Sequence, residues 1–137
     1  MMVAVHALTG AVLGGLCRRR THAFALGVAS HLVADALPHR DLAVPVEGAL
    51  LGAALAAVGA LKGADSPEFA GAVGAAAPDI ENLVAWLFHI PDEKLLVPSH
   101  RCYHGRKLEG VYEQVGLAAA CLAVLACGAS RRAEQEA

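Results

Sequence analysis

Histidine and aspartate recur at helical spacing just before a proline in the first third of the chain. His31 and Asp35 are four positions apart, so on a helix their Cβ atoms lie on one face, about 5 to 6 Å apart. An imidazole nitrogen and a carboxylate oxygen can then both reach one divalent ion, and His39, beyond Pro38, can turn back toward it. The alternative is a surface or capping histidine in an i,i+4 ion pair. Because both residues interrupt an otherwise apolar face, where unpaired polar groups are costly, the pattern favours a metal site.

A second proline precedes a pair of acids, Asp79 and Glu81, which flank Ile80 at the expected start of a helix. Taken alone, this segment is better explained as an Asp N-cap followed by a first-turn Glu. It nevertheless resembles the first cluster, since in both a small-residue helix stops at a proline and a ligand-type residue follows. Asp79 is therefore a candidate metal ligand, and Asp79 and Glu81 are candidate catalytic carboxylates.

The most polar stretch, residues 98–107, contains two histidines four positions apart. His100 and His104 can share a metal ion if this segment is helical. Arg101, between them, can hold an anionic oxygen bidentately, as phosphate recognition requires. The alternative is a basic loop beside a membrane, attracted to anionic lipid.

Three further histidines lie outside these clusters. His6 falls inside an apolar helix, where a lone histidine is usually a satisfied core residue, but here it is a candidate additional ligand for the same centre. His22, beside an arginine cluster, and His89, beside Ile90 and Pro91, fit interfacial positions. We leave these last two out of the expected site.

Four elements of the sequence carry a family resemblance: His6-Ala-Leu-Thr-Gly10, His31-Leu-Val-Ala-Asp35 with Pro38-His39, Pro78-Asp79-Ile80-Glu81, and His100-Arg101 with His104. Together they resemble the small membrane-bound, predicted metal-dependent hydrolases of the YdjM type, which are related in turn to zinc-dependent phospholipase C. The resemblance spans nearly the whole chain and implies that these elements are metal-site residues. Glu81 stands where the family has Asp, Cys102 where it has Gly, and the second His-x-x-x-Glu element of phospholipase C is missing. These departures favour a one- or two-metal site over a three-zinc site.

The apolar periodicity, together with prolines, glycines and capping residues at segment ends, predicts an all-α fold. We expect a compact bundle of five or six short helices in a single domain, residues 1–137. Pro38 and Pro78 are expected to end helices, because proline cannot donate the helical hydrogen bond and disfavours helical geometry in the residue before it. Ser66, Pro67 and Glu68 resemble an N-cap, a first-turn proline and a dipole-favouring acid. The expected helices cover residues 3–17, 22–37, 45–61, 67–77, 79–88 and 109–127.

The composition excludes several classes of protein. Thirty Ala and 14 Gly in a chain that is 56% hydrophobic argue against an all-β fold and against disorder. A net charge of −2 disfavours nucleic-acid binding by bulk charge. The four cysteines form no CxxC pair, and we interpret them as reduced.

Whether the bundle lies in a membrane depends on helix length. The longest stretches without a formal charge, residues 1–17 and 114–130, are 17 residues each, against about 20 for a spanning helix. Three Gly-x-x-x-Gly spacings (Gly10/Gly14, Gly48/Gly52 and Gly59/Gly63) allow the close helix approach that is common in membrane bundles. We expect a membrane-embedded or membrane-associated bundle in the inner or cytoplasmic membrane, with basic residues 18–20 and 131–132 facing the cytoplasm. The alternative is a soluble bundle.

These features combine into a hypothesis of a divalent-metal-dependent hydrolase. Zn²⁺ is the favoured ion for imidazole and carboxylate ligands, and it would lower the pKa of a bound water toward about 7. The expected ligands are His6, His31, Asp35, His39, Asp79, His100 and His104. Asp79 or Glu81 would act as general base and Arg101 would orient an anionic substrate, which the membrane location and the phospholipase resemblance suggest is a phosphoester, including a lipid one. The alternative is a non-catalytic small helical membrane protein in which the His/Asp pairs form a structural metal or hydrogen-bond site.

Overall fold

The computed structural model describes residues 1–96 and 110–136, and within them the regular elements are α-helices and one short 3₁₀ helix, joined by turns and short loops. This confirms the expected all-α bundle. The helices are α1 (Val3–Gly14), α2 (Arg20–Asp35), α3 (Val44–Lys62), α4 (Pro67–Phe88), η1 (Asp92–Lys94) and α6 (Tyr112–Glu136).

Helix α4 corrects the sequence analysis, because it continues through Pro78 and does not end there. Proline in a helix interior removes one hydrogen bond and costs about 3 kcal/mol in isolation. Here α4 packs against both α1 and α2, and Pro78 is fully buried. The carbonyl of Ala75, in the turn before the proline, accepts a hydrogen bond from His31 Nδ1 at 2.9 Å. Packing against α1 and α2 therefore maintains a helix that the sequence analysis expected to end at Pro78. As a result, Asp79 lies inside α4 and not at the start of a helix.

The remaining helix ends follow local chemistry. Ser66 Oγ accepts the backbone N–H of Phe69 at 3.0 Å, as the predicted N-cap of α4 requires. Gly63 adopts a φ of 86° and ends α3, a conformation that glycine tolerates without strain. Helix α1 ends at Gly14, earlier than the expected residue 17, and α2 starts at Arg20, earlier than the expected residue 22.

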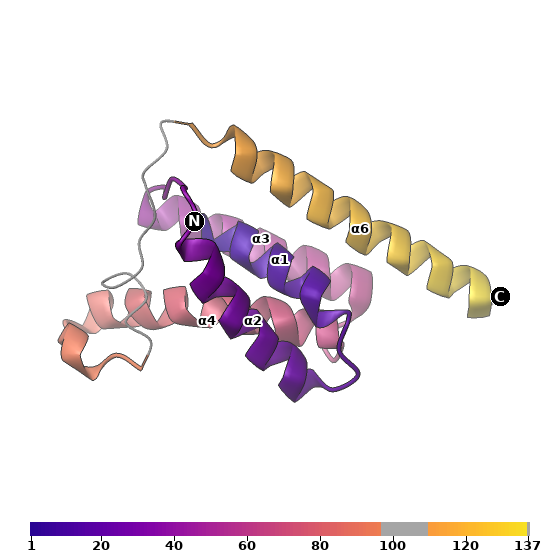
Figure 1. The fold of residues 1–137 in the computed structure, drawn as a ribbon, viewed down its shortest axis with the longest axis horizontal. Helices are drawn as coiled ribbons and strands as arrows, with labels where there is room; N and C mark the ends of the chain where they lie inside the picture. Colours follow the sequence, from indigo (N-terminus) through magenta and orange to yellow (C-terminus); the bar gives the residue numbers. More distant parts are fainter. Residues whose placement is uncertain (97–109, 137) are drawn as a thin grey trace.

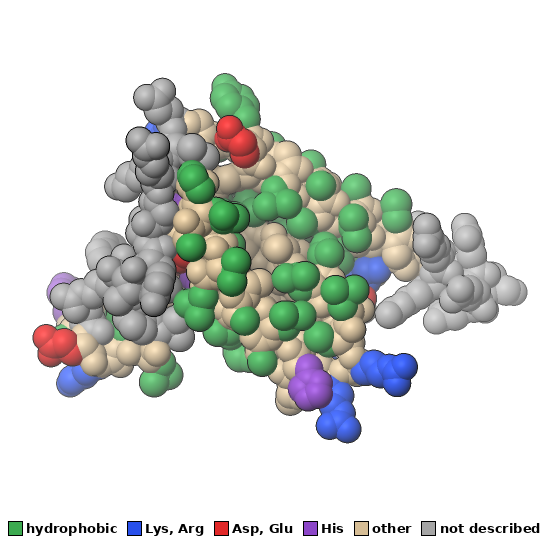
Figure 2. Space-filling model, viewed as in Figure 1, with side chains coloured by type: hydrophobic (Ala, Val, Ile, Leu, Met, Phe, Trp, Pro, Cys, Tyr) green, Lys and Arg blue, Asp and Glu red, His purple; other side chains and the backbone are tan. Residues whose placement is uncertain are grey.

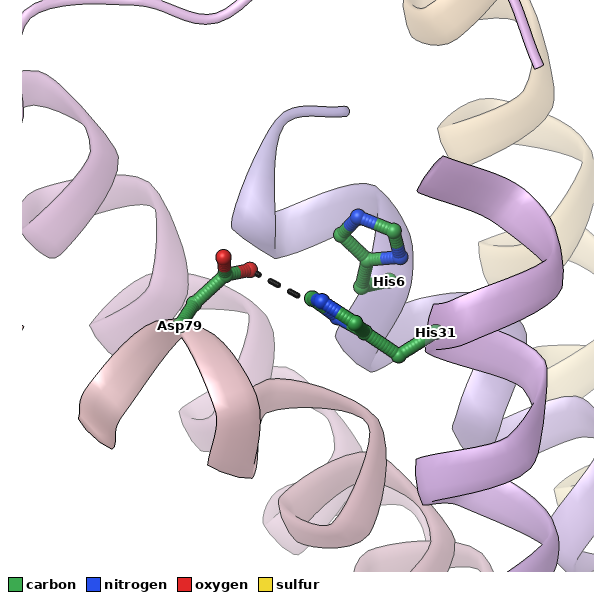
Figure 3. Close-up of side chains that lie close together, drawn as sticks. All are labelled: His6, His31 and Asp79. Carbon is green, nitrogen blue, oxygen red and sulfur yellow. Dashed lines mark ion pairs between the residues drawn. The ribbon is translucent and has the colours of Figure 1, made fainter. Parts of the chain in front are cut away.

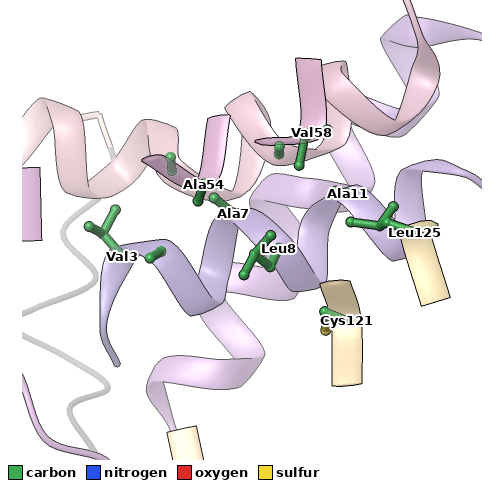
Figure 4. Packing of buried hydrophobic residues seen from close by; sticks show 11 residues of the cluster. Val3, Ala7, Leu8, Ala11, Ala54, Val58, Cys121 and Leu125 are labelled. Atoms are coloured by element: carbon green, nitrogen blue, oxygen red, sulfur yellow. The ribbon is translucent and has the colours of Figure 1, made fainter. Parts of the chain in front are cut away.

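Helices α1 and α2 form an antiparallel hairpin, and both pack on α4 (Figure 1). Helix α3 covers α1 and α4, while α6 lies across α1 and α3. The core between them consists of small side chains, such as Ala7, Ala11 and Ala72, with Val58 and Leu125 filling the wider gaps (Figure 4). Gln114 of α6 is one of the buried polar residues, and it accepts the N–H of Met2 while donating to the carbonyl of Arg40.

Glycine sets the closest approach in the bundle. A Cβ atom at Gly71 of α4 would collide with the carbonyl oxygen of Gly10 in α1, and one at Gly27 of α2 would collide with the carbonyl oxygen of Gly71. The Gly10/Gly14 spacing therefore marks a real helix crossing. Gly52 of α3, by contrast, has no heavy atom of another element within 4 Å of its Cβ position.

We expect Gly71→Ala to destabilise the fold by about 3 kcal/mol or more, because the new methyl group meets backbone that cannot rotate away. Gly52→Ala is the matched control, and it should be neutral or stabilising by up to about 1 kcal/mol since alanine favours the helix. Denaturant unfolding followed by circular dichroism measures both. Equal stability of the two variants would contradict the described crossing of α1, α2 and α4.

Two helical segments, Val44–Lys62 and Tyr112–Ala129, are long and apolar enough to cross a membrane. Only 11% and 17% of the respective spans are buried inside the bundle, so most of their apolar side chains face outward. Figure 2 shows hydrophobic side chains spread over much of the visible face. In length and composition these helices fit the core of a soluble bundle as well as a membrane-embedded one.

The connection between α1 and α2, which contains residues 18–19, and the part of α6 near Gly128 belong to the same end of the bundle (Figure 1). Arg20 pairs with Asp65 of the α3–α4 connection at 2.8 Å, and the side chain of Lys62, just before that connection, lies beside Gly128 near the end of α6. The opposite end contains the N-terminus of α1 and the α2–α3 connection (Figure 1). The predicted His/Asp residues of α1 and α2 lie toward that opposite end.

Candidate metal centre

Three helices each contribute a side chain to one buried polar cluster (Figure 3). His6 lies in the second turn of α1, His31 in the last turns of α2, and Asp79 in the middle of α4. The glycine crossing described above brings these three helices together. His6 and His31 are 2% and 0% exposed, whereas the Asp79 side chain retains 17% of its surface.

The ligand-type atoms of these three residues are close enough to converge on one ion. One nitrogen of each imidazole and one Asp79 carboxylate oxygen all lie within 4.8 Å of one another. Ligand atoms around a tetrahedral Zn²⁺ are about 3.3 Å apart, given metal–nitrogen distances near 2.0 to 2.1 Å. The His31 Nδ1 to Asp79 Oδ2 distance is already 3.8 Å, and the two imidazole centroids are 4.1 Å apart. Small side-chain rotations suffice to form a three-residue site.

Asp35 lies between the two histidines. Its Oδ1 is 3.0 Å from His6 Nε2, and its Oδ2 is 3.1 Å from His31 Nε2. Burial alone would raise the pKa of the Asp35 carboxyl, but hydrogen bonds with His31 and His6 outweigh burial and hold this pKa well below its usual range. The buried Asp35 carboxylate is surrounded by groups that stabilise its charged form, namely the two imidazoles and the Met1 amino group, 3.2 Å from Asp35 Oδ1.

His31 is held in one orientation by contacts at both ring nitrogens. A carbonyl oxygen only accepts, so in the 2.9 Å bond to Ala75 the proton is on His31 Nδ1. The other nitrogen, Nε2, faces the carboxylate of Asp35. An ion bound to Nε2 would have both His31 and Asp35 as ligands. An ion bound to Nδ1, on the side of Asp79, would instead displace the hydrogen bond between His31 and the Ala75 carbonyl. Asp35 is thus either a ligand or the carboxylate that orients both imidazoles.

His6 carries the observation that most directly favours a cation. Its Nε2 contacts Asp35, while its buried Nδ1 has no hydrogen-bond partner within the described residues. Leaving a buried polar atom unpaired costs about 1 to 3 kcal/mol. Burial lowers the pKa of His6, with the Asp35 hydrogen bond opposing this, and the neutral imidazole that burial favours is the form that coordinates a metal. The donor set therefore fits a divalent ion.

His39, expected as a further ligand, lies in an adjoining cluster. It is buried, its Nδ1 donates to the Leu37 carbonyl at 2.8 Å, and its Nε2 is 3.4 Å from Asp41 Oδ1. The Met1 amino group connects the two clusters, at 3.1 Å from Asp41 Oδ1 and 3.2 Å from Asp35 Oδ1. His39 is not among the residues whose ligand atoms converge with those of Asp79.

Glu81 is also separated from the converging group. Residues two apart on a helix point to different faces, so the continuity of α4 directs Glu81 away from Asp79. Its Oε1 accepts the backbone N–H of Leu96 at 2.6 Å. The remaining expected site residues, His100, Arg101 and His104, lie outside the described residues.

Three participants were not expected from the sequence. The Met1 amino group is one of them. Asp41 lies two residues after His39, and its closeness to that predicted ligand could have pointed to it. The Ala75 carbonyl is a backbone group, and no sequence pattern could have identified it as the partner of His31.

No protein family, curated protein or solved structure matches this chain. The candidate centre therefore rests on geometry alone. The metal ligands and the hydrolase activity that the family resemblance implies remain predictions.

Proposed function

We propose that this protein is a divalent-metal-dependent hydrolase of phosphoesters. The observation that carries the proposal is the convergence of His6, His31 and Asp79, three ligand-type residues from three separate helices, in a buried site. The buried Nδ1 of His6, which has no hydrogen-bond partner within the described residues, favours a cation there. Two imidazoles and a carboxylate are a ligand set typical of catalytic Zn²⁺, which keeps a fourth position open.

Each residue has a role that follows from its contacts. His6, His31 and Asp79 would hold the ion, and Asp35 would orient the two imidazoles through their other nitrogens. When bound, a divalent ion supplies Lewis-acid chemistry, polarising a phosphoryl oxygen and lowering the pKa of coordinated water. Substrate would approach from the side of Asp79, since both histidines are buried while Asp79 is partly exposed and lines a pocket.

Hydrolysis of bis(p-nitrophenyl) phosphate by the purified protein tests this function. We expect zinc-loaded protein to release p-nitrophenol, chelation to reduce the rate to that of buffer, and added Zn²⁺ to restore it. Because the proposed chemistry requires the ion, the loss should be complete and reversible. Zinc-loaded protein that is inactive on phosphodiesters, phosphomonoesters and acyl esters would contradict a hydrolase.

The second candidate is a structural site, and one observation favours it. Asp35 already links α1 and α2 through His6 and His31, so the cluster joins helices without any reaction. An ion bound there would raise the melting temperature, and its removal would lower it. Metal-dependent stability together with inactivity on every ester tested would support this candidate.

We further propose that the bundle lies in the inner or cytoplasmic membrane through α3 and α6, with residues 18–20 and 131–132 on the cytoplasmic side. The outward-facing apolar side chains of these helices support this location. We expect membrane fractions to retain the protein through high salt and alkaline washing, and detergent to release it. Recovery of a monodisperse protein from detergent-free lysate would show the soluble bundle instead.

A further inference from the structure

A pocket of about 380 Å³ lies beside Asp79, between the first turns of α3 and the middle of α4. Its volume is near the lower end of the roughly 300 to 1,000 Å³ that is typical of small-ligand sites. Asp79 belongs both to the pocket wall and to the group of converging metal-ligand atoms. Asp79 therefore links the pocket to the candidate metal centre.

The pocket wall is mainly apolar, but it includes four polar side chains. Asp41, Glu47 and Asp79 contribute carboxylates and Asn82 an amide, while the other lining residues are apolar. The Glu47 carboxylate accepts the backbone N–H groups of Val3 and Leu42. Val3 and Leu51 belong to or pack against the hydrophobic core. Val44, Ile80 and Leu83 are 50%, 38% and 40% exposed and are available for contact with a bound molecule.

We propose that this pocket binds the aliphatic chain of an amphiphilic substrate whose phosphoryl head lies at Asp79. The substrate class, which rests on the proposed function, is then a phosphoester of an alkyl chain. A mainly apolar wall that includes Asp79 of the metal centre fits a molecule with an aliphatic chain and a phosphoryl head. Each methylene buried against such a wall strengthens binding about fourfold. A small polar phosphoester would leave the apolar wall uncovered.

Gly48 of α3 provides a way to fill the pocket without disturbing the fold. It lines the pocket, and its Cβ position has no heavy atom within 4 Å apart from its own helix. A leucine there would occupy the pocket volume. Gly116 of α6 is the matched control, because it is the fifth residue of its helix, as Gly48 is of α3, has the same open surroundings and lies outside the pocket.

The direct test uses an octyl phosphate with a photoreactive diazirine at the end of its chain, applied to wild type, Gly48→Leu and Gly116→Leu. Peptide mapping should find labels on the α3 and α4 segments that line the pocket in wild type and Gly116→Leu. We expect labelling in Gly48→Leu to fall at least tenfold. Equal labelling of all three proteins, or labels spread evenly over the exposed apolar helices, would overturn the proposal.

A second measurement separates this inference from the proposed function. Across a series of p-nitrophenyl alkyl phosphates from methyl to hexyl, kcat/KM should rise about fourfold per methylene in wild type and Gly116→Leu. It should be nearly independent of chain length in Gly48→Leu, with the zinc content unaffected. Pocket labelling in a protein without zinc or hydrolysis would support the chain site and contradict the hydrolase. Hydrolysis without dependence on chain length would support the hydrolase and overturn the chain site.

Discussion

Replacing His31 with alanine should lower the affinity of the protein for Zn²⁺ by more than 100-fold. His31 lies at the centre of the cluster, with Asp35 3.1 Å from one ring nitrogen and Asp79 3.8 Å from the other. Loss of a residue that only orients a ligand costs about 10- to 100-fold in metal affinity, so loss of a ligand should exceed that range. Titration with a competing chromophoric chelator measures the affinity.

Three other histidines serve as controls. His22 and His89 are exposed, and neither contributes to the converging group, so His22→Ala and His89→Asn should retain wild-type affinity. Asparagine suits position 89 because that residue has a φ of 54°. His39→Ala tests a buried histidine of the adjoining cluster and should also retain the ion. Equal loss of zinc from His31→Ala and the controls would mean that zinc binds elsewhere or unspecifically.

Asp35→Asn distinguishes the two roles left to that carboxylate. Asparagine keeps the shape of the side chain but removes the charge that faces both imidazoles. A fall in zinc affinity of about 10- to 100-fold would identify Asp35 as the residue that orients the histidines, and a larger fall would identify a ligand.

Asp79→Asn should abolish hydrolysis of phosphodiesters at limiting zinc, with a loss of at least about 1,000-fold in kcat/KM. Asp79 is the residue of the converging group that also lines the pocket, so its carboxylate is both the expected ligand and the group nearest the substrate. General-base contributions alone are about 100- to 10,000-fold, and loss of the ion adds to them. Steady-state kinetics and zinc content are measured on the same preparation.

Glu81→Gln is the matched control for Asp79→Asn. It makes the same change two residues along α4, where the side chain binds the Leu96 amide. Zinc content and rate should stay near the wild-type values. Zinc lost in Asp79→Asn would assign a ligand, and zinc retained with the rate lost would assign a base. Full zinc and full rate in Asp79→Asn would contradict the proposed site.

Local patterns predicted most of the helices because small residues, prolines and caps act within a few positions. They misassigned Pro78, since the contacts that hold α4 together come from α1 and α2. Gly71 illustrates the limit, because nothing in its own segment indicates that two other backbones lie against it. The glycine spacing indicates that a helix can approach another helix closely, but it does not say which helix. The partner is determined by the tertiary fold.

The candidate site likewise contains some contacts that sequence spacing predicts and others that depend on the tertiary fold. His31 and Asp35 meet because four positions on one helix place them on one face, and sequence spacing contains that information. His6 reaches these two residues only through the packing of α1 against α2 and α4. It was expected as an additional ligand because it interrupts an apolar helix, but no sequence spacing connects it to His31 and Asp35. Glu81 was expected beside Asp79 because a helix was assumed to begin there. The uninterrupted α4 separates the two carboxylates instead.

The metal content of the wild-type protein tests the central claim most directly. The protein should be purified without chelator and analysed by inductively coupled plasma mass spectrometry, with His31→Ala prepared in parallel. We predict at least one equivalent of a divalent transition metal, most of it zinc, in wild type and less than a tenth of that in His31→Ala. Wild-type protein without bound metal, and unable to take up added Zn²⁺, would contradict the claim that His6, His31 and Asp79 form a metal centre.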